Sequence, residues 1–414
     1  MKIIGSISES RADIPVIGEF DVVVVGGGIA GVAAALAAAR VRGTRVCLME
    51  KVCALGGLAT VGNVIIYLPL CDGRGRQVIG GIGEELLRLS VDEVEVPNLR
   101  ISKVPACWDG NGTVEERSKH RFRVGFNPIT FEYKMERLLL KNHITLYYDM
   151  RFSTVLKKNG SITAVIAESK AGRVALRCKA VVDCSGEADV CREAGEKTVS
   201  IGENVRCGWY YYIDKDEKVQ LRCLTDPLRI RKVDENGNRL KYYSFKGDAP
   251  EQVTAQVLES RKMMMEDIEK IREKDGGNPI PIMSPTIPTF RMSRRLAAKV
   301  SLKETDDHRW FDDTLGMTGD WRKAGPVFCL PLRCLAAVKT ANLITAGRCL
   351  SSMGDTWDVT RVIPTCAVSG EAAGIAAAFL ARDEECRSFF DLDIPMLQKY
   401  IRRHKGIIDK ELVR

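Results

Sequence analysis

The chain has 414 residues, of which 45% are hydrophobic and 28% are charged, as in ordinary globular proteins with full cores. Its 62 basic and 54 acidic residues give a net charge of +8, which is mild for this length, so nucleic acid is not an expected partner. We expect a cytoplasmic protein without a membrane span, because the N-terminus lacks a signal-peptide pattern and glycines interrupt the apolar run after Val22.

The spacing of cysteine and histidine predicts no metal site. The 14 cysteines occur singly, without a C-x-x-C pair, and there are only four histidines. We expect most of the thiols to be small buried groups in a reducing compartment.

The clearest pattern lies at residues 21–50. Four consecutive valines at 22–25 predict a buried parallel strand, and the alanine-rich residues 32–40 predict a helix. Residues 45–49 predict a second strand. Strand, helix and strand in this order are typical of a dinucleotide-binding βαβ unit.

Three glycines and one acidic residue complete this unit. Gly26 permits a tight turn, Gly28 lets the backbone approach a pyrophosphate, and Gly31 lets the helix pack closely on the strand. The helix N-terminus offers free N–H groups to the phosphates. Glu50 can accept hydrogen bonds from a ribose 2′-hydroxyl and disfavours a 2′-phosphate, so FAD or NAD is expected rather than NADP.

A second glycine turn follows at Gly56 and Gly57. This turn and the Thr60 hydroxyl could meet the second half of the dinucleotide, but a plain loop is an equal alternative. Residues 80–90 and 128–141 predict amphipathic helices.

The next part of the chain is predicted to be rich in strands. The predicted strands are residues 144–150, 152–158, 162–168, 172–176 and 180–186. Asn159-Gly160 predicts a tight hairpin turn. The last strand ends at Ser185 and Gly186, a small turn that could approach a cofactor.

Residues 204–287 differ in character, with aromatic residues among charges. A helix is predicted over residues 250–274, and we expect its methionines at 263–265 to fill a core. We expect this part to be a separate substrate or cap domain.

The C-terminal third adds two further elements of the predicted site. Residues 342–347 predict a short strand that ends at Gly347, and a helix is predicted from Pro364 to residue 382. The tail at 395–414 is predicted to be a basic amphipathic helix, exposed or in contact with a second copy, which is compatible with a homodimer.

The number of glycine motifs favours FAD over a nicotinamide dinucleotide. An enzyme with separate FAD and NADPH modules would show two G-x-G-x-x-G motifs, whereas this chain has one. Turns far apart in the sequence complete the site instead, which favours FAD, a large cofactor contacted by several strand ends of one sheet.

Several stretches resemble a known family. They are GGGIAGVAAALAAAR, VCLMEK, LGG, VVDCSGEADV, SRRL, NLITAGRCLSS and RVIPTCAVSGEAAGIAAA. They resemble the FAD-dependent oxidoreductases of the glutathione-reductase-type Rossmann superfamily, closest to the FAD-oxidored family and distantly similar to fumarate reductase flavoproteins. The resemblance leaves out residues 200–285. It implies an α/β fold, a Rossmann-type FAD-binding domain with a central parallel sheet plus an inserted α+β substrate or cap domain.

The resemblance also implies a division into domains. Its parts are FAD-binding segments at 15–90, 126–200 and 331–384, a loop-rich cap segment at 91–125, a substrate or cap domain at 201–330 and a helical tail at 385–414.

The residues implied to bind FAD fall into groups along the cofactor. They are Gly26, Gly28 and Gly31 for the pyrophosphate; Glu50 and Lys51 for the adenosine ribose; Val155 for adenine; Ser185 and Gly186 along the nucleotide; Gly56, Gly57 and Thr60 on the ribityl and flavin side; Gly347 and Arg348 for the ribityl chain; and Arg361, Pro364 and Thr365 for the flavin pyrimidine ring. Arg348 departs from many relatives, which have an acidic residue there.

The expected chemistry is two-electron hydride transfer between FAD and a small organic substrate, and the basic charge would suit an anionic one. A helix beginning near Pro364 would direct its positive end at the charge of reduced flavin. Arg361 could stabilise that charge or bind a substrate carboxylate. An ion pair with Asp355 or Asp358 is the equal alternative for Arg361.

Arg291, Arg294 and Arg295 are weaker candidates, and Arg295 is retained as a second catalytic one. An exposed basic strand is the favoured interpretation of all three.

Two other functions are weaker alternatives. The charge and the basic tail would suit a flavin-bound RNA-interacting or structural subunit, but no aromatic–basic RNA motif supports it. Cys53 near the second glycine turn suggests a thiol–disulfide reductase, but the positions directly after that turn, residues 58–61, hold no cysteine.

Overall fold

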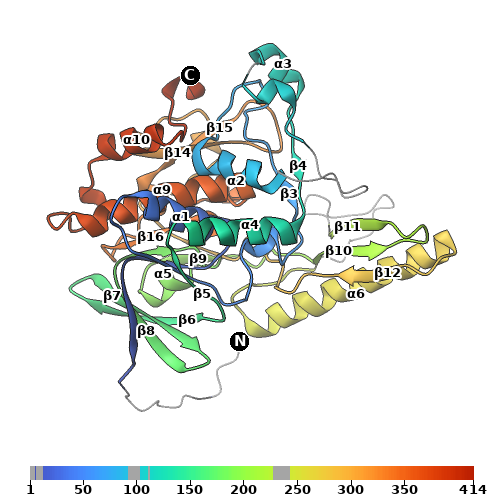
Figure 1. Ribbon diagram of the computed structural model, residues 1–414, viewed down its shortest axis with the longest axis horizontal. Helices are drawn as coiled ribbons and strands as arrows, with labels where there is room; N and C mark the ends of the chain where they lie inside the picture. Colours follow the sequence, from blue (N-terminus) through green and yellow to red (C-terminus); the bar gives the residue numbers. More distant parts are fainter. Residues whose placement is uncertain (1–4, 6–12, 92–102, 111, 227–242) are drawn as a thin grey trace.

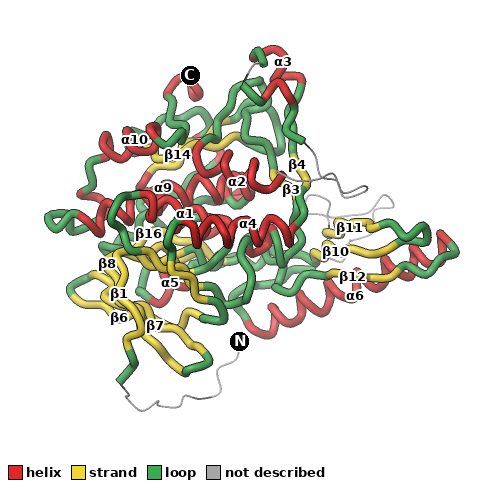
Figure 2. Tube along the Cα trace, viewed as in Figure 1, coloured by secondary structure: helices red, strands yellow, loops and turns green. Residues whose placement is uncertain are grey.

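A computed structural model describes residues 5, 13–91, 103–110, 112–226 and 243–414 (Figure 1). Helices cover one large sheet, and a long helix with a smaller sheet extends to one side (Figure 2). The predicted cap segment at 91–125 and the predicted cap domain at 201–330 each lie partly outside the described residues.

The large sheet has the strand order β5–β2–β1–β8–β7–β6, with β16 beside β8. Its strands are β1 Val16–Val25, β2 Val46–Met49, β5 Thr145–Tyr147, β6 Arg151–Lys158, β7 Ser161–Ser169, β8 Gly172–Asp183 and β16 Leu343–Thr345. Strands β5, β2, β1, β8 and β16 are parallel, whereas β6, β7 and β8 form an antiparallel meander. The predicted parallel sheet and hairpin are therefore confirmed.

Two predicted strand boundaries are wrong. The strands predicted at 172–176 and 180–186 are one continuous strand, β8, because its first half pairs with the hairpin and its second half with β16. The strand predicted at 144–150 ends at Tyr147, since Asp149 takes a left-handed conformation that starts a new strand.

The valine run has side chains on both faces of the sheet. Val22 and Val24 pack in the larger core under the helices, whereas Val23 and Val25 pack in a second core with Met49. Successive side chains of a strand alternate between faces, so a strand covered on both sides must be apolar throughout.

Four helices lie on the face that holds the larger core (Figure 1). They are α1 Ile29–Arg40, α2 Gly81–Val91, α4 Pro128–Lys141 and α9 Ile363–Arg382. A Cβ at Gly370 would overlap the carbonyl oxygen of Ala30, and one at Gly374 that of Ala34, so α9 packs backbone to backbone on α1. The predictions of these four helices are confirmed.

One described helix, α9, is long and apolar enough to cross a membrane. In this structure 89% of its most apolar stretch is buried. Packing against α1 therefore accounts for its apolar sequence.

The smaller sheet and the long helix form a unit that we call the arm. It consists of β10 Cys207–Ile213, β11 Val219–Thr225, β12 Ile280–Met283 and α6 Pro250–Asp275. Tyr210 and Tyr212 pack there against Met264 and Ile268. The expectation for the methionines is correct for Met264 and wrong for Met265, which is 53% exposed, because adjacent helix residues point in different directions.

Shorter elements complete the described part of the fold. They are β3 Ile66–Tyr67 with β4 Val124–Gly125, β9 Thr198–Ser200 with β13 Arg294–Leu296, β14 Thr314–Gly319 with β15 Val327–Pro331, and the helices α3 Val114–Lys119, α5 Asp189–Glu193, α7 Leu332–Leu335 and α8 Gly354–Thr360.

The tail is not one helix. Helix α10 covers Ile394–Arg403 and ends where Lys405 takes a left-handed conformation and Gly406 donates to the carbonyl of Ile401. A 3₁₀ turn at Lys410–Val413 follows, and it buries Leu412 and Val413.

Candidate functional site

The first glycine turn is determined by close packing. Gly26 has φ +105°, and a Cβ there would overlap the carbonyl oxygen of Cys184. A Cβ at Gly31 would overlap the carbonyl oxygen of Gly26. Only glycine therefore fits at both positions, which are the tight turn and the close packing expected of this motif.

Gly28 differs from these two glycines. A Cβ placed there would meet no heavy atom within 4 Å beyond its immediate neighbours. Gly28 is also the N-cap of α1, and no side chain caps this helix. The free N–H groups at the start of α1 therefore border open space, which suits a phosphate.

The second glycine turn lies against the first. Gly56 donates its N–H to the carbonyl of Gly27 at 2.8 Å, and a Cβ at Gly57 would lie 3.3 Å from the Cα of Gly28. The Thr60 hydroxyl bonds the carbonyls of Leu55 and Gly57, so it is used inside the turn.

The end of β16 reaches the same place. A Cβ at Gly347 would lie 2.8 Å from the Cβ of Ala30 in the first turn of α1. The N–H of Gly347 donates to the Ser369 hydroxyl of α9 at 2.9 Å. We call these three glycine segments, at Gly26–Gly31, Gly56–Gly57 and Gly347, the glycine cradle.

Glu50 stabilises the cradle. Its carboxylate accepts the N–H of Gly27 at 2.6 Å and that of Val52 at 3.0 Å. A carboxylate has about four acceptor positions, so a ribose hydroxyl could bind in addition. Lys51 beside it is exposed, and Val155 is half-buried within β6.

The turn after β8 is organised by Asp183, a residue that the sequence analysis did not single out. Its buried carboxylate accepts the hydroxyl of Ser185 at 2.6 Å and the N–H of Cys191 at 3.0 Å. Burial raises the pKa of Asp183, while these hydrogen bonds act in the opposite direction. The one sequence signal for this role is an acidic residue at the end of a buried strand.

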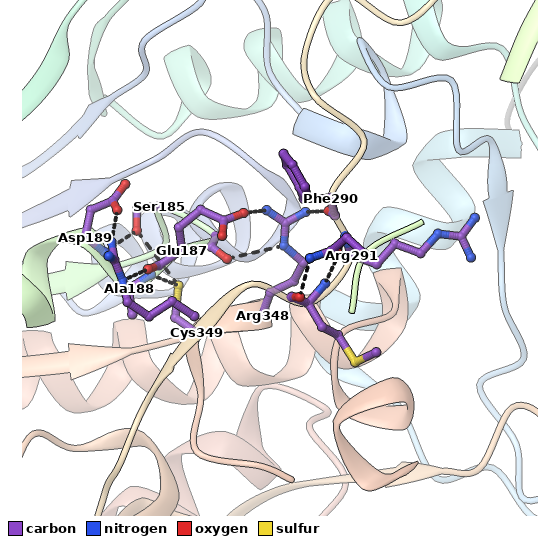
Figure 3. Close-up of polar contacts among 12 residues, drawn as sticks. Ser185, Glu187, Ala188, Asp189, Phe290, Arg291, Arg348 and Cys349 are labelled. Carbon is purple, nitrogen blue, oxygen red and sulfur yellow. Dashed lines mark hydrogen bonds and ion pairs between the residues drawn. The ribbon is translucent and has the colours of Figure 1, made fainter. Parts of the chain in front are cut away.

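Arg348 holds this turn from the other side (Figure 3). Its guanidinium donates to the carbonyl of Phe290 at 2.6 Å, to Glu187 Oε1 at 3.1 Å and to the carbonyl of Gly186 at 3.4 Å. A Cβ at Gly186 would overlap the same guanidinium. The side chain of Arg348 is thus committed to protein contacts.

The start of α9 is a second uncapped helix N-terminus. Its N-cap is Val362, without a side-chain hydrogen bond, and Pro364 lies in its first turn. The hydroxyl of Thr365 is buried and bonds Thr318 Oγ1 at 2.7 Å and the carbonyl of Val359 at 3.1 Å. Thr365 can therefore offer its backbone, but its hydroxyl is already occupied.

Arg361 precedes this helix and forms an ion pair with Asp358. Asp355 instead pairs with Arg322 at 3.0 Å. Burial lowers the pKa of the Arg361 guanidinium, Asp358 raises it, and Arg291 lowers it. Its buried Nε has no hydrogen-bond partner among the described residues.

The prediction that Arg291, Arg294 and Arg295 lie on an exposed basic strand is wrong for two of the three. Arg294 and Arg295 are each 5% exposed, because β13 packs between the turn after β8 and the segment at Gly347. Arg294 pairs with Asp189 at 2.5 Å.

Arg295 has no ion-pair partner among the described residues, and its guanidinium lies over the Trp357 ring at 5.6 Å. Burial lowers its pKa. Its hydrogen bonds within the described chain go to the carbonyl of Leu296 and the hydroxyl of Ser301, and not to the cradle or to the start of α9.

The cysteines give no support to a thiol–disulfide reductase. None of the 14 forms a disulfide, and Cys53 is exposed. Cys366 lies in the first turn of α9, where burial raises the pKa of its thiol to about 11. This thiol is therefore protonated near neutral pH and unsuited to nucleophilic attack.

The sequence comparison with protein families decides the class of this protein. The model of the family described as "FAD dependent oxidoreductase" matches residues 21–207 and 211–401. The chain belongs to this family. It is therefore an FAD-dependent oxidoreductase with an α/β Rossmann-type fold, and its cofactor is FAD, as expected from the glycine motifs.

Solved structures of similar fold include three proteins at low sequence identity. A geranylgeranyl bacteriochlorophyll reductase-like protein from Thermoplasma acidophilum is 14% identical, with 96% of this chain and 90% of that chain covered and a TM-score of 0.45. A 3-ketosteroid-Δ4-(5α)-dehydrogenase from Rhodococcus jostii RHA1 is 14% identical, with 88% and 97% covered and a TM-score of 0.41. A flavocytochrome c3 fumarate reductase is 15% identical, with 89% and 79% covered and a TM-score of 0.43. No curated protein sequence matches significantly.

The cradle fits the cofactor of this family. Three segments far apart in the sequence meet at Gly28, Gly57 and Gly347, and the space beside Gly28 is open. An uncapped helix N-terminus beside that space can bind a diphosphate without any cationic side chain.

Proposed function

We propose that this FAD-dependent oxidoreductase transfers two electrons, as a hydride, between bound FAD and a small organic substrate. The observation that carries the proposal is the glycine cradle, in which Gly57 and Gly347 close on the open N-terminus of α1 at Gly28. Bound FAD supplies the hydride chemistry, and the protein supplies orientation and electrostatics.

The binding roles follow from the positions of the residues. Gly26, Gly28 and Gly31 would hold the pyrophosphate, and Glu50 and Lys51 the adenosine ribose, with Val155, Ser185 and Gly186 along the adenosine half. Gly56, Gly57, Thr60, Gly347 and Arg348 would line the ribityl side through their backbone, since the side chains of Thr60 and Arg348 bind protein groups.

Pro364, Thr365 and Arg361 would act on the electrostatics of the flavin. The uncapped N-terminus of α9 and the guanidinium of Arg361 both carry positive potential. This potential would stabilise negative charge that develops on reduction. Arg295 is disfavoured as a catalytic residue, because its surroundings are Trp357 and Ser301.

The arm would cover the substrate, as the cap domain expected at 201–330. It contacts the segment that follows the second glycine turn, through a hydrogen bond from Asn63 to the carbonyl of Trp209 at 3.1 Å. The segments at 15–90, 126–200 and 331–384 would form the FAD-binding domain. A cytoplasmic location and a homodimer remain part of the proposal.

The test is anaerobic reduction of the FAD-loaded protein. We expect the absorbance of oxidised flavin to be lost on addition of one class among carboxylates, amines, alcohols and NAD(P)H. Purified protein that takes up no FAD would overturn the proposal.

A further inference from the structure

The arm meets the FAD-binding body at a place that we call the junction. Its residues are Asn63, Trp209, Thr225, Arg291 and Arg361. Asn63 donates to the carbonyl of Trp209, and the indole N–H of Trp209 donates to Thr225 Oγ1 at 3.4 Å. Arg291 donates to the same Thr225 oxygen at 3.2 Å, so these groups form one connected chain across the junction.

Among the described residues, the junction and the neighbouring Arg348 carry more positive than negative charge. Three guanidinium groups, those of Arg291, Arg348 and Arg361, influence one another, since Arg291 and Arg348 both act to lower the pKa of Arg361. Their carboxylate partners are Glu187 for Arg348 and Asp358 for Arg361.

The carboxylate of Asp358 is shared between two arginines, because the guanidinium of Arg322 also lies 4.0 Å from it.

Arg291 is the group without a balancing charge. Its guanidinium donates to two uncharged groups, Thr225 Oγ1 and, at 3.4 Å, Cys207 Sγ. Within the described residues no carboxylate lies in ion-pair distance of it. Figure 3 shows its side chain extending away from Arg348. A half-buried guanidinium with neutral partners can accept a bidentate anion.

Asn63 adds an unused acceptor to this charge. It is fully buried, and its Oδ1 has no hydrogen-bond partner among the described residues. Leaving a buried acceptor unpaired costs free energy, so a ligand that donates an O–H or N–H to it would bind more tightly.

We infer that the junction binds the carboxylate of the substrate, with Arg291 as its direct ligand and Arg361 beside it, while Asn63 accepts a hydrogen bond from a hydroxyl or amino group of the same molecule. The substrate class is then a small hydroxy or amino acid. This inference rests on the proposed function, because it takes the bound acid to be the substrate of the FAD held by the cradle.

The experiment uses FAD-loaded protein and three acids: lactate, 3-hydroxybutyrate and alanine. Each is compared with its primary amide, which lacks the negative charge, and lactate is also compared with propionate, which lacks the donor. Binding is followed by the change in the flavin absorbance spectrum. We expect at least one acid to bind about tenfold or more tightly than its amide, and lactate to bind several-fold more tightly than propionate.

Two variants assign these preferences to residues. Arg291→Gln should remove the preference for the acid over the amide, and Asn63→Leu should remove the preference for lactate over propionate. Arg309→Gln removes the same charge from an exposed side chain that pairs with the buried Asp306, and it should change neither preference. If Arg291→Gln does not fold, Arg291→Lys, which keeps the charge but loses the fork, should weaken acid binding.

The failures are distinguishable. Protein that takes up no FAD overturns the proposed function and this inference with it. FAD-loaded protein that binds acids and amides equally, or keeps its preference for acids in Arg291→Gln, overturns this inference alone.

Discussion

The carboxylate of Glu50 accepts the backbone N–H of Gly27 at 2.6 Å, across 23 residues of sequence. The acidic residue that ends the second strand of the βαβ unit thus holds the glycine turn in shape, besides being placed to meet a ribose. This double use explains why the turn can leave the helix N-terminus at Gly28 uncapped and open.

Replacing Glu50 should therefore affect the protein before any cofactor binds. Glu50→Ala leaves the N–H groups of Gly27 and Val52 unpaired, and we expect a loss of roughly 1–3 kcal/mol in the free energy of unfolding of the FAD-free protein. Urea denaturation measures this loss. Glu19→Ala removes an exposed pair with Arg177 and should cost less than about 1 kcal/mol. Equal effects of the two changes would contradict the role of Glu50.

The neighbouring arginines of β13 should behave in opposite ways. Arg294→Met leaves Asp189 and the carbonyl of Glu187 without their donor, and we expect about 1–3 kcal/mol of destabilisation. Arg295→Met replaces a buried cation without an ion-pair partner in the described chain by an apolar chain of similar length, so unfolding should change by less than about 1 kcal/mol. Flavin reduction should survive Arg295→Met. If the folded, FAD-loaded Arg295→Met variant no longer supports flavin reduction, Arg295 is again a catalytic candidate.

Glu371 should make stability depend on pH. It is buried in α9, where burial raises its pKa from 4.5 to about 8, opposed by the N–H of Ile82 and by Arg40. The carboxyl group loses its proton near pH 4.5 in the unfolded chain and near pH 8 in the folded protein. Between these two pH values the folded state holds a proton that the unfolded state has lost, so the free energy of unfolding falls as pH rises across this window.

The slope would be at most about 1.4 kcal/mol per pH unit. Glu371→Gln keeps an acceptor for Ile82 and cannot ionise, so it should flatten the pH dependence between the two values and unfold later than the native protein at higher pH. Urea midpoints measured across this range that are parallel for both proteins would show that Glu371 is ionised in the fold.

Arg361 should set the reduction potential of the bound flavin. Arg361→Gln removes positive charge before the N-terminus of α9 and leaves Asp358 negative, so we expect the two-electron midpoint potential to fall by about 30 mV or more, equivalent to about 1.4 kcal/mol. Arg322→Gln removes the same charge from the far side of Asp358 and should shift the midpoint potential less. Equal shifts would mean that Arg361 acts only through the general charge of the region.

The elements predicted correctly are those encoded by neighbouring residues. The valine run, the alanine-rich helix and the Asn159-Gly160 turn, whose two residues both have φ above +50°, require no information from elsewhere in the chain. The helix at α4 carries its own cap, Asn127, and its own Pro128.

The errors come from contacts that join distant segments. Arg294 and Arg295 are buried because Asp189, Trp357 and the segment at Gly347 surround β13, and no local pattern encodes those neighbours. The partners of Arg348 lie 58 residues or more away, so its commitment to the protein could not be predicted from its place after Gly347. The unused groups of the junction likewise become visible only when the arm is placed against the turn at Asn63.

The central claim is that FAD lies in the open space beside Gly28, and Gly28→Val tests it most directly. A Cβ at this position meets no heavy atom within 4 Å beyond its immediate neighbours, and the valine side chain would occupy the space proposed for the pyrophosphate. We predict that the FAD-free variant unfolds in urea at the same midpoint as the native protein, yet takes up no FAD, as measured by flavin absorbance after gel filtration. Uptake of FAD by Gly28→Val with native affinity would contradict the account.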